Sequence, residues 1–355
     1  MEFNSAALEP YLRAKISADL KVTSIVRFGR GTSRETWFAT FEKADGAKQS
    51  LVLRRDYIAG PIDPSPLDRE YFIYERLGRT DVPISRVLWW EDDPKWTDRP
   101  FYVREHVEGS WNIPHFTDPD PLYDILRIAI SKEHMQNLAR VHAVDWQELG
   151  FEARFRAPAR GEDAAALNID LILDQLEQCR VDPVPIVLEA AAWMKERAPV
   201  APRLCLCKGT NGLGEEIFRD GKLVAMSDWE ESSIGDPAAD FAFMQSMAPD
   251  IVRNGENIWS LQKALDYYQS VSGHPVAIES VRFYGLVRAL KMAVFGQAAA
   301  ASVHRDPDRA EIRQAWTGTE VNHNAQRILG SAMGWMGPLN PVLFNEVHLS
   351  VEQLA

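Results

Sequence analysis

The apolar pattern of this sequence changes once along the chain, near Gly109, and that change constrains the fold more than any other feature. Up to this point short apolar runs alternate with turn signals, which is typical of a meander of antiparallel strands. These strand-like runs cover residues 23–28, 35–41, 50–54, 85–90 and 101–105, with helical patterns at 6–20 and 68–77. A small β-rich lobe is therefore predicted for the first third of the chain.

Beyond Gly109 the apolar residues mostly recur with the spacing of helices. Helices are predicted at residues 121–143, 168–178, 185–197, 238–247, 258–271 and 278–302. One β-rich island, residues 203–228, interrupts them. The pattern predicts an α+β fold with two lobes: an N-terminal lobe of residues 1–107 and a larger, mainly helical lobe of residues 108–355.

The composition is that of a globular protein with an acidic surface. Hydrophobic residues make up 46% of the 355 residues and charged residues 25%, and the formal net charge is −12. Such a charge repels phosphate backbones and anionic lipid, so we expect a small-molecule substrate and no nucleic-acid or membrane partner. Residues 1–20 have the pattern of neither a signal peptide nor a membrane span, which predicts a cytoplasmic protein. Nothing in the sequence indicates an oligomeric state.

The cysteines are Cys179, Cys205 and Cys207. An odd and sparse set does not make a disulfide framework and suits a reducing compartment. Cys205 and Cys207 do not have the spacing of zinc ligands. We interpret both as packing residues and expect their thiols on opposite faces of a strand.

Four segments carry a family resemblance when they are taken in order. They are Arg27-Phe28-Gly29-Arg30-Gly31-Thr32-Ser33, Leu51-Val52-Leu53-Arg54-Arg55, Leu138-Ala139-Arg140-Val141-His142-Ala143-Val144-Asp145-Trp146, and Ser227-Asp228-Trp229-Glu230 with Ile234-Gly235-Asp236-Pro237-Ala238-Ala239-Asp240. Together they resemble the aminoglycoside phosphotransferase and choline kinase family, especially its bacterial branch of uncharacterised phosphotransferases. The resemblance covers residues 20 to 300 and implies a protein kinase-like two-lobed fold, with ATP and magnesium as cofactors.

The resemblance also implies a nucleotide site between the lobes. Its parts are a phosphate-binding loop with Gly29, Arg30 and Gly31, and a basic strand residue, Arg54, with its acidic partner Glu70. The segment that joins the lobes, Glu105 to Val107, and a metal-binding Asp, Asp228, complete the site. Glycines let a backbone approach phosphate oxygens, and a carboxylate suits a hard cation. An ordinary hairpin turn and an unpaired surface Arg and Glu remain the alternatives. Asp236, Asp240 and His142 are predicted to be structural.

The catalytic loop departs from the family's pattern, which reads HGDxxxxN. There the Asp contacts the acceptor hydroxyl and the Asn holds metal. Counting back from Asp228 places this loop at residues 208–215. Lys208 stands for the His, Thr210 for the Asp and Glu215 for the Asn, and only Gly209 is kept.

These replacements change the chemistry that the loop can perform. Thr210 cannot accept a proton at neutral pH, and general-base assistance is typically worth roughly 10²–10⁴ in rate. The Glu215 carboxylate can ligate magnesium, so we expect it close enough to Asp228 to share an ion. Lys208 brings a positive charge to the acceptor side and could act as a base beside Glu215 or Glu216.

Three functions stay open from the sequence. The first is an ATP-dependent phosphotransferase with an altered catalytic loop, acting on a small hydroxylated molecule. The second is a kinase-like fold reused for other chemistry, such as elimination or hydration with Lys208 as base. The third is a pseudokinase that binds a nucleotide or another ligand without turnover. We favour the first, because positioning and charge stabilisation supply most of phosphoryl transfer.

Overall fold

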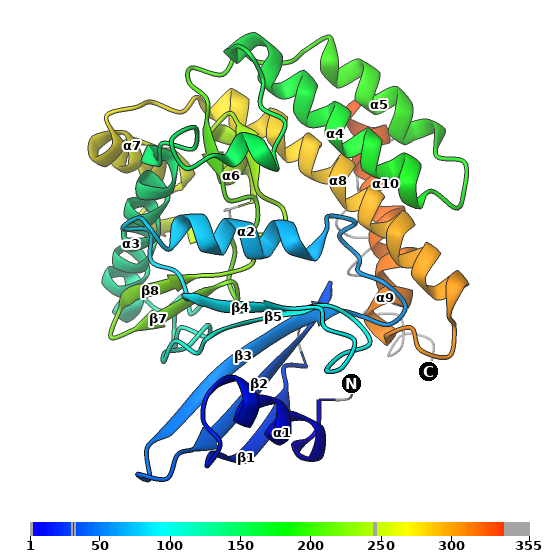
Figure 1. The fold of residues 1–355 in the computed structure, drawn as a ribbon. Helices are drawn as coiled ribbons and strands as arrows, with labels where there is room; N and C mark the ends of the chain where they lie inside the picture. The colour runs from blue at the N-terminus through cyan, green and yellow to red at the C-terminus, as the bar shows by residue number, and fades with distance from the viewer. Residues whose placement is uncertain (1–2, 30, 32, 244–246, 337–355) are drawn as a thin grey trace, which may run out of the picture.

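The structure is a computed structural model that describes residues 3–29, 31, 33–243 and 247–336. Its N-terminal lobe is built on one antiparallel sheet of five strands in the order β1-β2-β3-β5-β4 (Figure 1). The strands are β1 Lys21–Arg27, β2 Arg34–Glu42, β3 Lys48–Asp56, β4 Val87–Glu91 and β5 Phe101–Glu105. Each overlaps one of the five predicted runs, so the predicted β-rich meander is confirmed.

Two helices cover the sheet on opposite faces, α1 Ser5–Lys15 and α2 Leu67–Leu77. Successive side chains of a strand point to opposite faces. In β5 the buried Phe101 and Val103 pack in the cluster that contains α1, whereas Tyr102 packs with α2 and the helical lobe. As a result α2 lies between the sheet and the second lobe, where it can bring a side chain to both (Figure 1).

The second lobe is mainly helical, as predicted. Its helices are α3 Asp124–Ala143, α4 Ala164–Cys179, α5 Pro185–Lys195, α6 Ala238–Phe243, α7 Leu261–Ser272, α8 Ile278–Arg305, α9 Ile312–Trp316 and α10 Asn322–Ala332. Short 3-10 turns at Pro121–Tyr123, Phe151–Ala153 and Gly161–Asp163 and a π-helical turn at Thr317–Val321 connect them. The predicted helix at 258–271 begins only at Leu261, because the Ser260 side chain caps it there and β11 precedes it.

Short strand pairs hold the connecting segments of this lobe. They are β6 Cys205–Cys207 with β9 Ser233–Gly235, β7 Glu216–Arg219 with β8 Lys222–Met226, and β10 Ile251–Arg253 with β11 Glu256–Trp259. The Sγ atoms of Cys205 and Cys207 lie 3.9 Å apart. The prediction of opposite faces was wrong, because residues two apart in a strand share a face.

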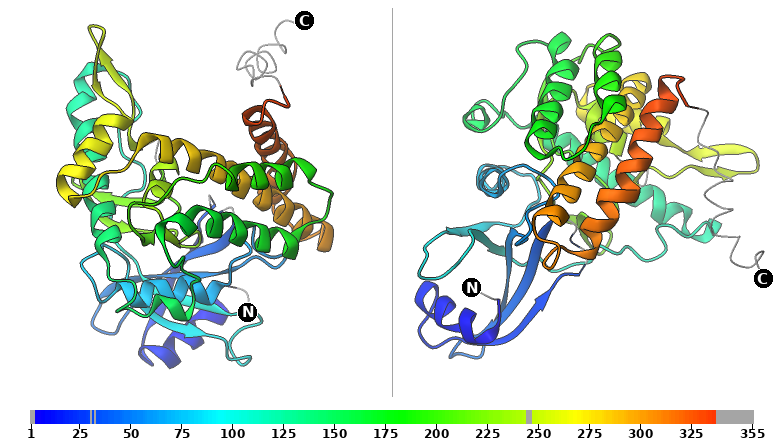
Figure 2. Two further views of the ribbon diagram at one scale, coloured as in Figure 1. Left: turned by 90° about the horizontal axis from the view of Figure 1, so that it is seen from above. Right: turned by 90° about the vertical axis from the view of Figure 1, so that its right-hand side faces the viewer.

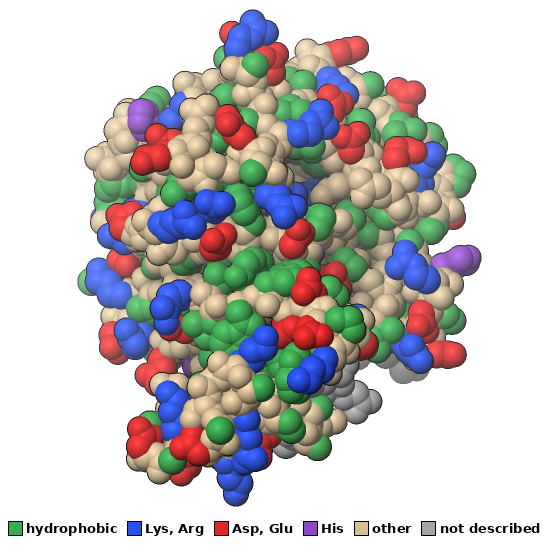
Figure 3. Space-filling model, viewed as in Figure 1, with side chains coloured by type: hydrophobic (Ala, Val, Ile, Leu, Met, Phe, Trp, Pro, Cys, Tyr) green, Lys and Arg blue, Asp and Glu red, His purple; other side chains and the backbone are tan. Residues whose placement is uncertain are grey.

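Helix α8 is the central helix of the second lobe. Figure 2 shows it running between α4 and α5 on one side and α10 on another, and it contacts all three. It is long and apolar enough to cross a membrane, but most of its apolar stretch is buried inside this lobe. Its apolar character is therefore explained by packing. Over the face drawn in Figure 3, acidic and basic side chains are interspersed.

The two lobes are joined where the predicted catalytic loop lies. Ser110 and Phe218 exchange two backbone hydrogen bonds of 2.8 Å, which tie the segment after β5 to β7. The Met226 N–H donates to the Pro83 carbonyl at 2.7 Å, which ties the end of β8 to the segment before β4. The loop 208–215 follows β6, and residues 227–232 follow β8, so both are positioned at this junction.

Candidate functional site

A cavity of about 190 Å³ lies between the lobes, and we call it the interlobe cavity. Four residues predicted for the nucleotide and metal sites line it: Gly31, Arg54, Glu215 and Asp228. The loop after β1, strand β3, the catalytic loop and the end of β8 each bring one of them. The predicted phosphate ligand Arg30 lies outside the described residues.

The glycine loop needs a glycine at Gly31 but has open space at Gly29. A Cβ atom on Gly31 would come within 2.8 Å of the Arg34 carbonyl oxygen, whereas one on Gly29 would meet nothing within 4 Å. The Tyr57 hydroxyl donates to the Gly31 carbonyl at 2.7 Å and holds the loop against the end of β3. Gly31 is therefore required by a contact within the loop itself, and the approach of this backbone to phosphate oxygens stays a prediction.

Arg54 forms the predicted ion pair with Glu70, with 2.9 Å between Nε and Oε2. Its Nη2 atom also lies 3.1 Å from Asp228 Oδ1 and 3.2 Å from Glu230 Oε2. Although burial opposes the charged form of Glu70, Arg54 and a second arginine lower its pKa. The guanidinium thus connects β3, α2 and the end of β8.

The second arginine is Arg34, which the sequence reasoning missed. Its side chain is completely buried, and its Nη1 atom lies 3.2 Å from Glu70 and 3.0 Å from Glu230. Its Nε atom donates to Asp56 at 2.7 Å. The available signals were its place directly after the glycine loop and the position of Glu230 within the Asp228-Trp229-Glu230 motif.

Asp228 adopts a backbone conformation that is uncommon for a residue other than glycine. Its φ angle is +63°, in the left-handed region, and such strain collects at functional positions. Burial raises the pKa of its carboxyl group, and Arg54 only partly offsets that effect. The carboxylate is therefore held in a place where a further cation would stabilise it.

The segment joining the lobes differs from the prediction at Glu105. Its N–H donates to the Arg86 carbonyl at 2.9 Å, and its own carbonyl accepts from the Ser85 hydroxyl. Because this backbone is already paired with the segment before β4, the expected contact of Glu105 with an adenine edge needs correction. Val107 is the position in this segment that remains for such a contact.

Lys208 is completely buried, and it lines neither the interlobe cavity nor a second cavity of about 380 Å³ next to α4 and α8. Its Nζ atom lies 3.2 Å from Glu216 Oε1 and also donates to the Thr210 carbonyl. Burial raises the pKa of Glu216 to about 7, although Lys208 works in the opposite direction. Of the two neighbours that the sequence offered, Glu215 and Glu216, the structure pairs Lys208 with Glu216, whereas Glu215 lines the interlobe cavity.

The catalytic loop is held from behind by Asp240. This carboxylate accepts the N–H groups of Lys208 and Gly209 at 2.8 and 2.7 Å, and lies 2.9 Å from His142 Nε2. Gly209 has φ +89°, and a Cβ atom there would come within 2.5 Å of the Glu231 carbonyl oxygen. His142 and Asp240 thus make structural hydrogen bonds, as predicted. Asp240 was expected to stabilise the helix that contains it, but it holds the catalytic loop.

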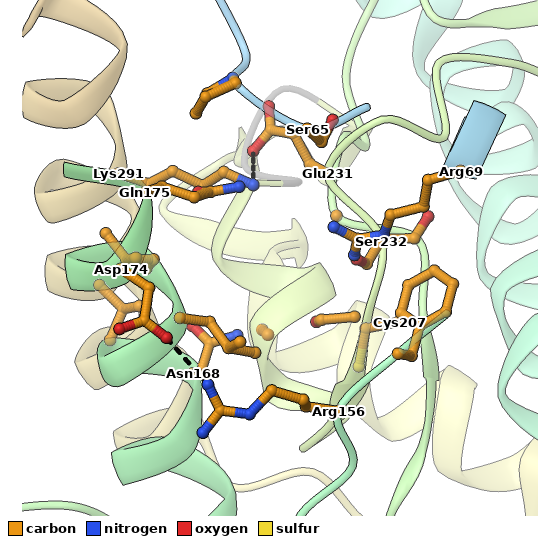
Figure 4. Close-up of a pocket in the computed structure, with 18 of the residues that line it drawn as sticks. Ser65, Arg69, Arg156, Asn168, Asp174, Gln175, Cys207, Glu231, Ser232 and Lys291 are labelled. Atoms are coloured by element: carbon orange, nitrogen blue, oxygen red, sulfur yellow. Dashed lines mark hydrogen bonds and ion pairs between the residues drawn. The ribbon is translucent and has the colours of Figure 1, made fainter. Parts of the chain in front are cut away.

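A second cavity, of about 380 Å³, lies between the helices of the second lobe and the start of α2, and we call it the helical-lobe cavity. It is bounded by the start of α2, by α4 and α8, by Gly209 of the catalytic loop, and by Cys207 and residues 231–233 at the ends of β6 and β9 (Figure 4). Thr210, the next loop residue, is buried with 5% of its surface exposed. The two cavities thus reach the same loop at different residues, one at Gly209 and the other at Gly214 and Glu215.

Comparison with known proteins identifies the family. The model of the phosphotransferase enzyme family matches residues 24–271, which is more than half of the chain. The chain belongs to this family. A candidate aminoglycoside phosphotransferase from Ralstonia eutropha is 21% identical, with a TM-score of 0.62 over 94% of this chain and 98% of that one.

Two further structures in the family are complexes with ligands. An aminoglycoside phosphotransferase bound to gentamicin is 16% identical, with a TM-score of 0.54 over 90% of this chain and 97% of that one. Another, bound to ADP and hygromycin B, is 15% identical, with a TM-score of 0.52 over 88% and 99%. These likenesses confirm the predicted kinase-like two-lobed fold.

Curated relatives are much longer proteins. Acyl-CoA dehydrogenase family member 10 of Mus musculus is 27% identical over 243 residues, which are 67% of this chain and 22% of that protein. Member 11 of Rattus norvegicus is 24% identical over 256 residues, or 68% and 31%. The chain therefore spans between a fifth and a third of the length of these relatives.

Proposed function

We propose that this protein is an ATP-dependent phosphotransferase that acts on a small hydroxylated molecule and works with an altered catalytic loop. The observation that carries the proposal is the network in which Arg54 joins Glu70 on α2 to Asp228 after β8. In kinases a basic strand residue paired with a helix Glu, next to a metal-binding Asp, is the machinery that positions phosphates. One structural relative is a complex with ADP and hygromycin B, which agrees with this use of the cleft.

The residues of the interlobe cavity fit a divalent cation. Two guanidinium groups, Arg34 and Arg54, face three carboxylates of the network, Glu70, Asp228 and Glu230, and Glu215 lines the same cavity. No group of three His, Cys, Asp or Glu residues in the described parts of the chain is arranged as a metal site. Magnesium does not require one, because it binds one or two carboxylates together with water and phosphate oxygens. Asp228 and Glu215 are the residues that would hold it.

The interlobe cavity is smaller than a whole nucleotide requires. Ligand cavities usually have volumes of roughly 300–1,000 Å³, so the interlobe cavity of about 190 Å³ must widen to take a whole nucleotide. The donors of Arg54 are occupied by Glu70, Thr36 and the carboxylates at the end of β8. We infer that Arg54 positions the metal-binding Asp228, and that the loop at Gly31 supplies backbone contacts to phosphate.

The catalytic loop has no strong base at the position that would accept the proton of the acceptor hydroxyl. Thr210 replaces the catalytic Asp, and Lys208 is buried against Glu216. In the helical-lobe cavity, burial opposes the charged form of Glu231, but Arg288 and Lys291 lower its pKa to about 2, so it is a weak base. Bound magnesium would supply charge stabilisation, and the chain's own residues would orient the two reactants. We therefore expect slow transfer, roughly 10²–10⁴ below that of an enzyme with the base.

The absence of this base also favours a second candidate, a pseudokinase that binds nucleotide without turnover. A thermal-shift titration with AMP-PNP and magnesium tests binding, and release of ADP from ATP in the presence of alcohol acceptors tests turnover. Saturation at 100 times the dissociation constant should stabilise the fold by about 2.7 kcal/mol. Asp228→Asn should abolish the magnesium-dependent part of the shift, whereas the exposed control Arg160→Gln should not. A wild-type protein with no shift at millimolar AMP-PNP would eliminate both candidates and favour non-kinase chemistry.

A further inference from the structure

The helical-lobe cavity is positively charged, in contrast to the chain as a whole. The chain carries a formal net charge of −12. The charged residues that line the cavity are the carboxylates Asp174 and Glu231 and the cations Arg69, Arg154, Arg156, Arg288 and Lys291. A local excess of cations in an acidic protein concentrates anions at that place.

Arg69 is the cation in this wall whose charge is not balanced. It comes from the start of α2, rests on the Phe155 ring at 4.2 Å, and donates from Nη2 to the Ser232 carbonyl (Figure 4). Among the described residues, no carboxylate lies within ion-pair distance of it, and its buried Nε atom has no hydrogen-bond acceptor. Burial lowers its pKa, and the carboxylate of Asp63, which lies beyond ion-pair distance, offsets that effect only in part.

The other cations are compensated to different degrees. Arg156 pairs with Asp174 at 2.8 Å on the exposed rim, where both side chains have 61% of their surface exposed. Deeper in the cavity, one carboxylate, Glu231, is shared by Arg288 and by Lys291, whose Nζ lies 3.2 Å from it. Lys291 also lies 3.8 Å from the buried Asp63, and Arg154 pairs with Asp68 at 3.1 Å. Each of these cations therefore has a carboxylate partner, which Arg69 lacks.

We propose that this cavity binds an acceptor substrate carrying an anionic group, a carboxylate or a phosphate, and that Arg69 is its main ligand. The inference rests on the proposed function, since it assigns the class of acceptor for the same site. Ile172 and Val287 line the cavity together with Gly209 of the catalytic loop, so an apolar portion can lie along α4 and α8 while a hydroxyl reaches the loop. A polycation such as gentamicin, bound by one structural relative, would meet the same charge as its own here.

The test is calorimetric titration of the intact protein, without nucleotide, using matched probes. The anionic probes are 3-hydroxybutyrate and glycerol 3-phosphate, the neutral ones are 1,3-butanediol and glycerol, and gentamicin is the cationic one. We expect at least one anion to bind at least about tenfold more tightly than its neutral counterpart. Arg69→Gln should weaken that binding roughly 10- to 100-fold, the effect of one charge-assisted hydrogen bond. Arg69→Lys should retain part of it, and the exposed control Arg160→Gln should retain all of it.

Each result separates the possibilities. Binding of only the carboxylate or only the phosphate ester supports the proposal and names the anion. Neutral or cationic probes that bind as tightly as the anions would overturn it, as would an anion affinity that Arg69→Gln leaves unchanged. Melting temperature and circular dichroism establish that each variant is folded, and Arg69→Lys provides the comparison if Arg69→Gln is not. Because no nucleotide is present, anion binding can succeed while the AMP-PNP titration fails, or the reverse.

Discussion

The buried ion pair of Lys208 and Glu216 makes a prediction about how stability depends on pH. Glu216 has 2% of its surface exposed, and burial raises its pKa from 4.5 to about 7. The folded protein therefore binds a proton on Glu216 that the unfolded chain releases between these two values. The contribution of Glu216 to stability should fall as pH rises across that interval, by about 3 kcal/mol at roughly 1.4 kcal/mol per pKa unit, and should level off above pH 7.

Replacing Lys208 by Met extends this loss to higher pH. Lys208 is the cation that lowers the pKa of Glu216, whereas the nearby carboxylates of Glu215 and Asp228 raise it. Without Lys208 the folded-state pKa of Glu216 should rise further, so the carboxyl stays protonated to higher pH and the decline continues. Between pH 7 and 8.5 the variant should lose about 2 kcal/mol relative to wild type, from roughly 1.4 kcal/mol per pH unit.

The assay is urea unfolding followed by tryptophan fluorescence at pH 5.5, 7.0 and 8.5, with linear extrapolation to water. The double variant Lys208→Met with Glu216→Gln carries no titrating group at this place, so its difference from wild type should not grow above pH 7. Glu216→Gln alone leaves a buried cation without its partner and should cost about 3–5 kcal/mol. A Lys208→Met penalty that is equal at pH 7.0 and 8.5 would refute the pairing on which this reasoning depends.

Two further perturbations test the geometry of the site. Gly209→Ala places a Cβ within 2.5 Å of a backbone oxygen at φ +89° and should lower the free energy of unfolding by more than about 2 kcal/mol, measured by urea titration. The control Gly221→Ala, at φ +74° with nothing within 4 Å, should cost only about 1 kcal/mol, and equal costs would contradict the proposed crowding. Glu70→Gln removes the carboxylate shared by two buried arginines and should lower the free energy of unfolding by about 3–5 kcal/mol in the same assay. The same variant should also lose the thermal shift caused by AMP-PNP. An unchanged shift in that variant would separate the ion pair from nucleotide binding.

The sequence by itself determined the fold and the location of the site. Strand and helix periodicity predicted the five strands of the first lobe and most helices of the second, because local apolar pattern decides which face of an element is buried. The ion pair between Arg54 and Glu70 followed from a basic strand and an acidic helix placed in family order. The loop 208–215 was located by counting from Asp228, and the structure places it at the junction of the lobes.

Only the tertiary structure decided which other side chains meet around the site. Lys208 pairs with Glu216, the first residue of β7, whereas Glu215, the residue before that strand, lines the interlobe cavity. The roles of Arg34 and Arg69 had no local signal, since each depends on partners or cavity walls brought together from distant segments. The charge of a cavity is the sum of such contributions from several elements. For that reason an acidic chain can contain a cationic cavity that its composition did not predict.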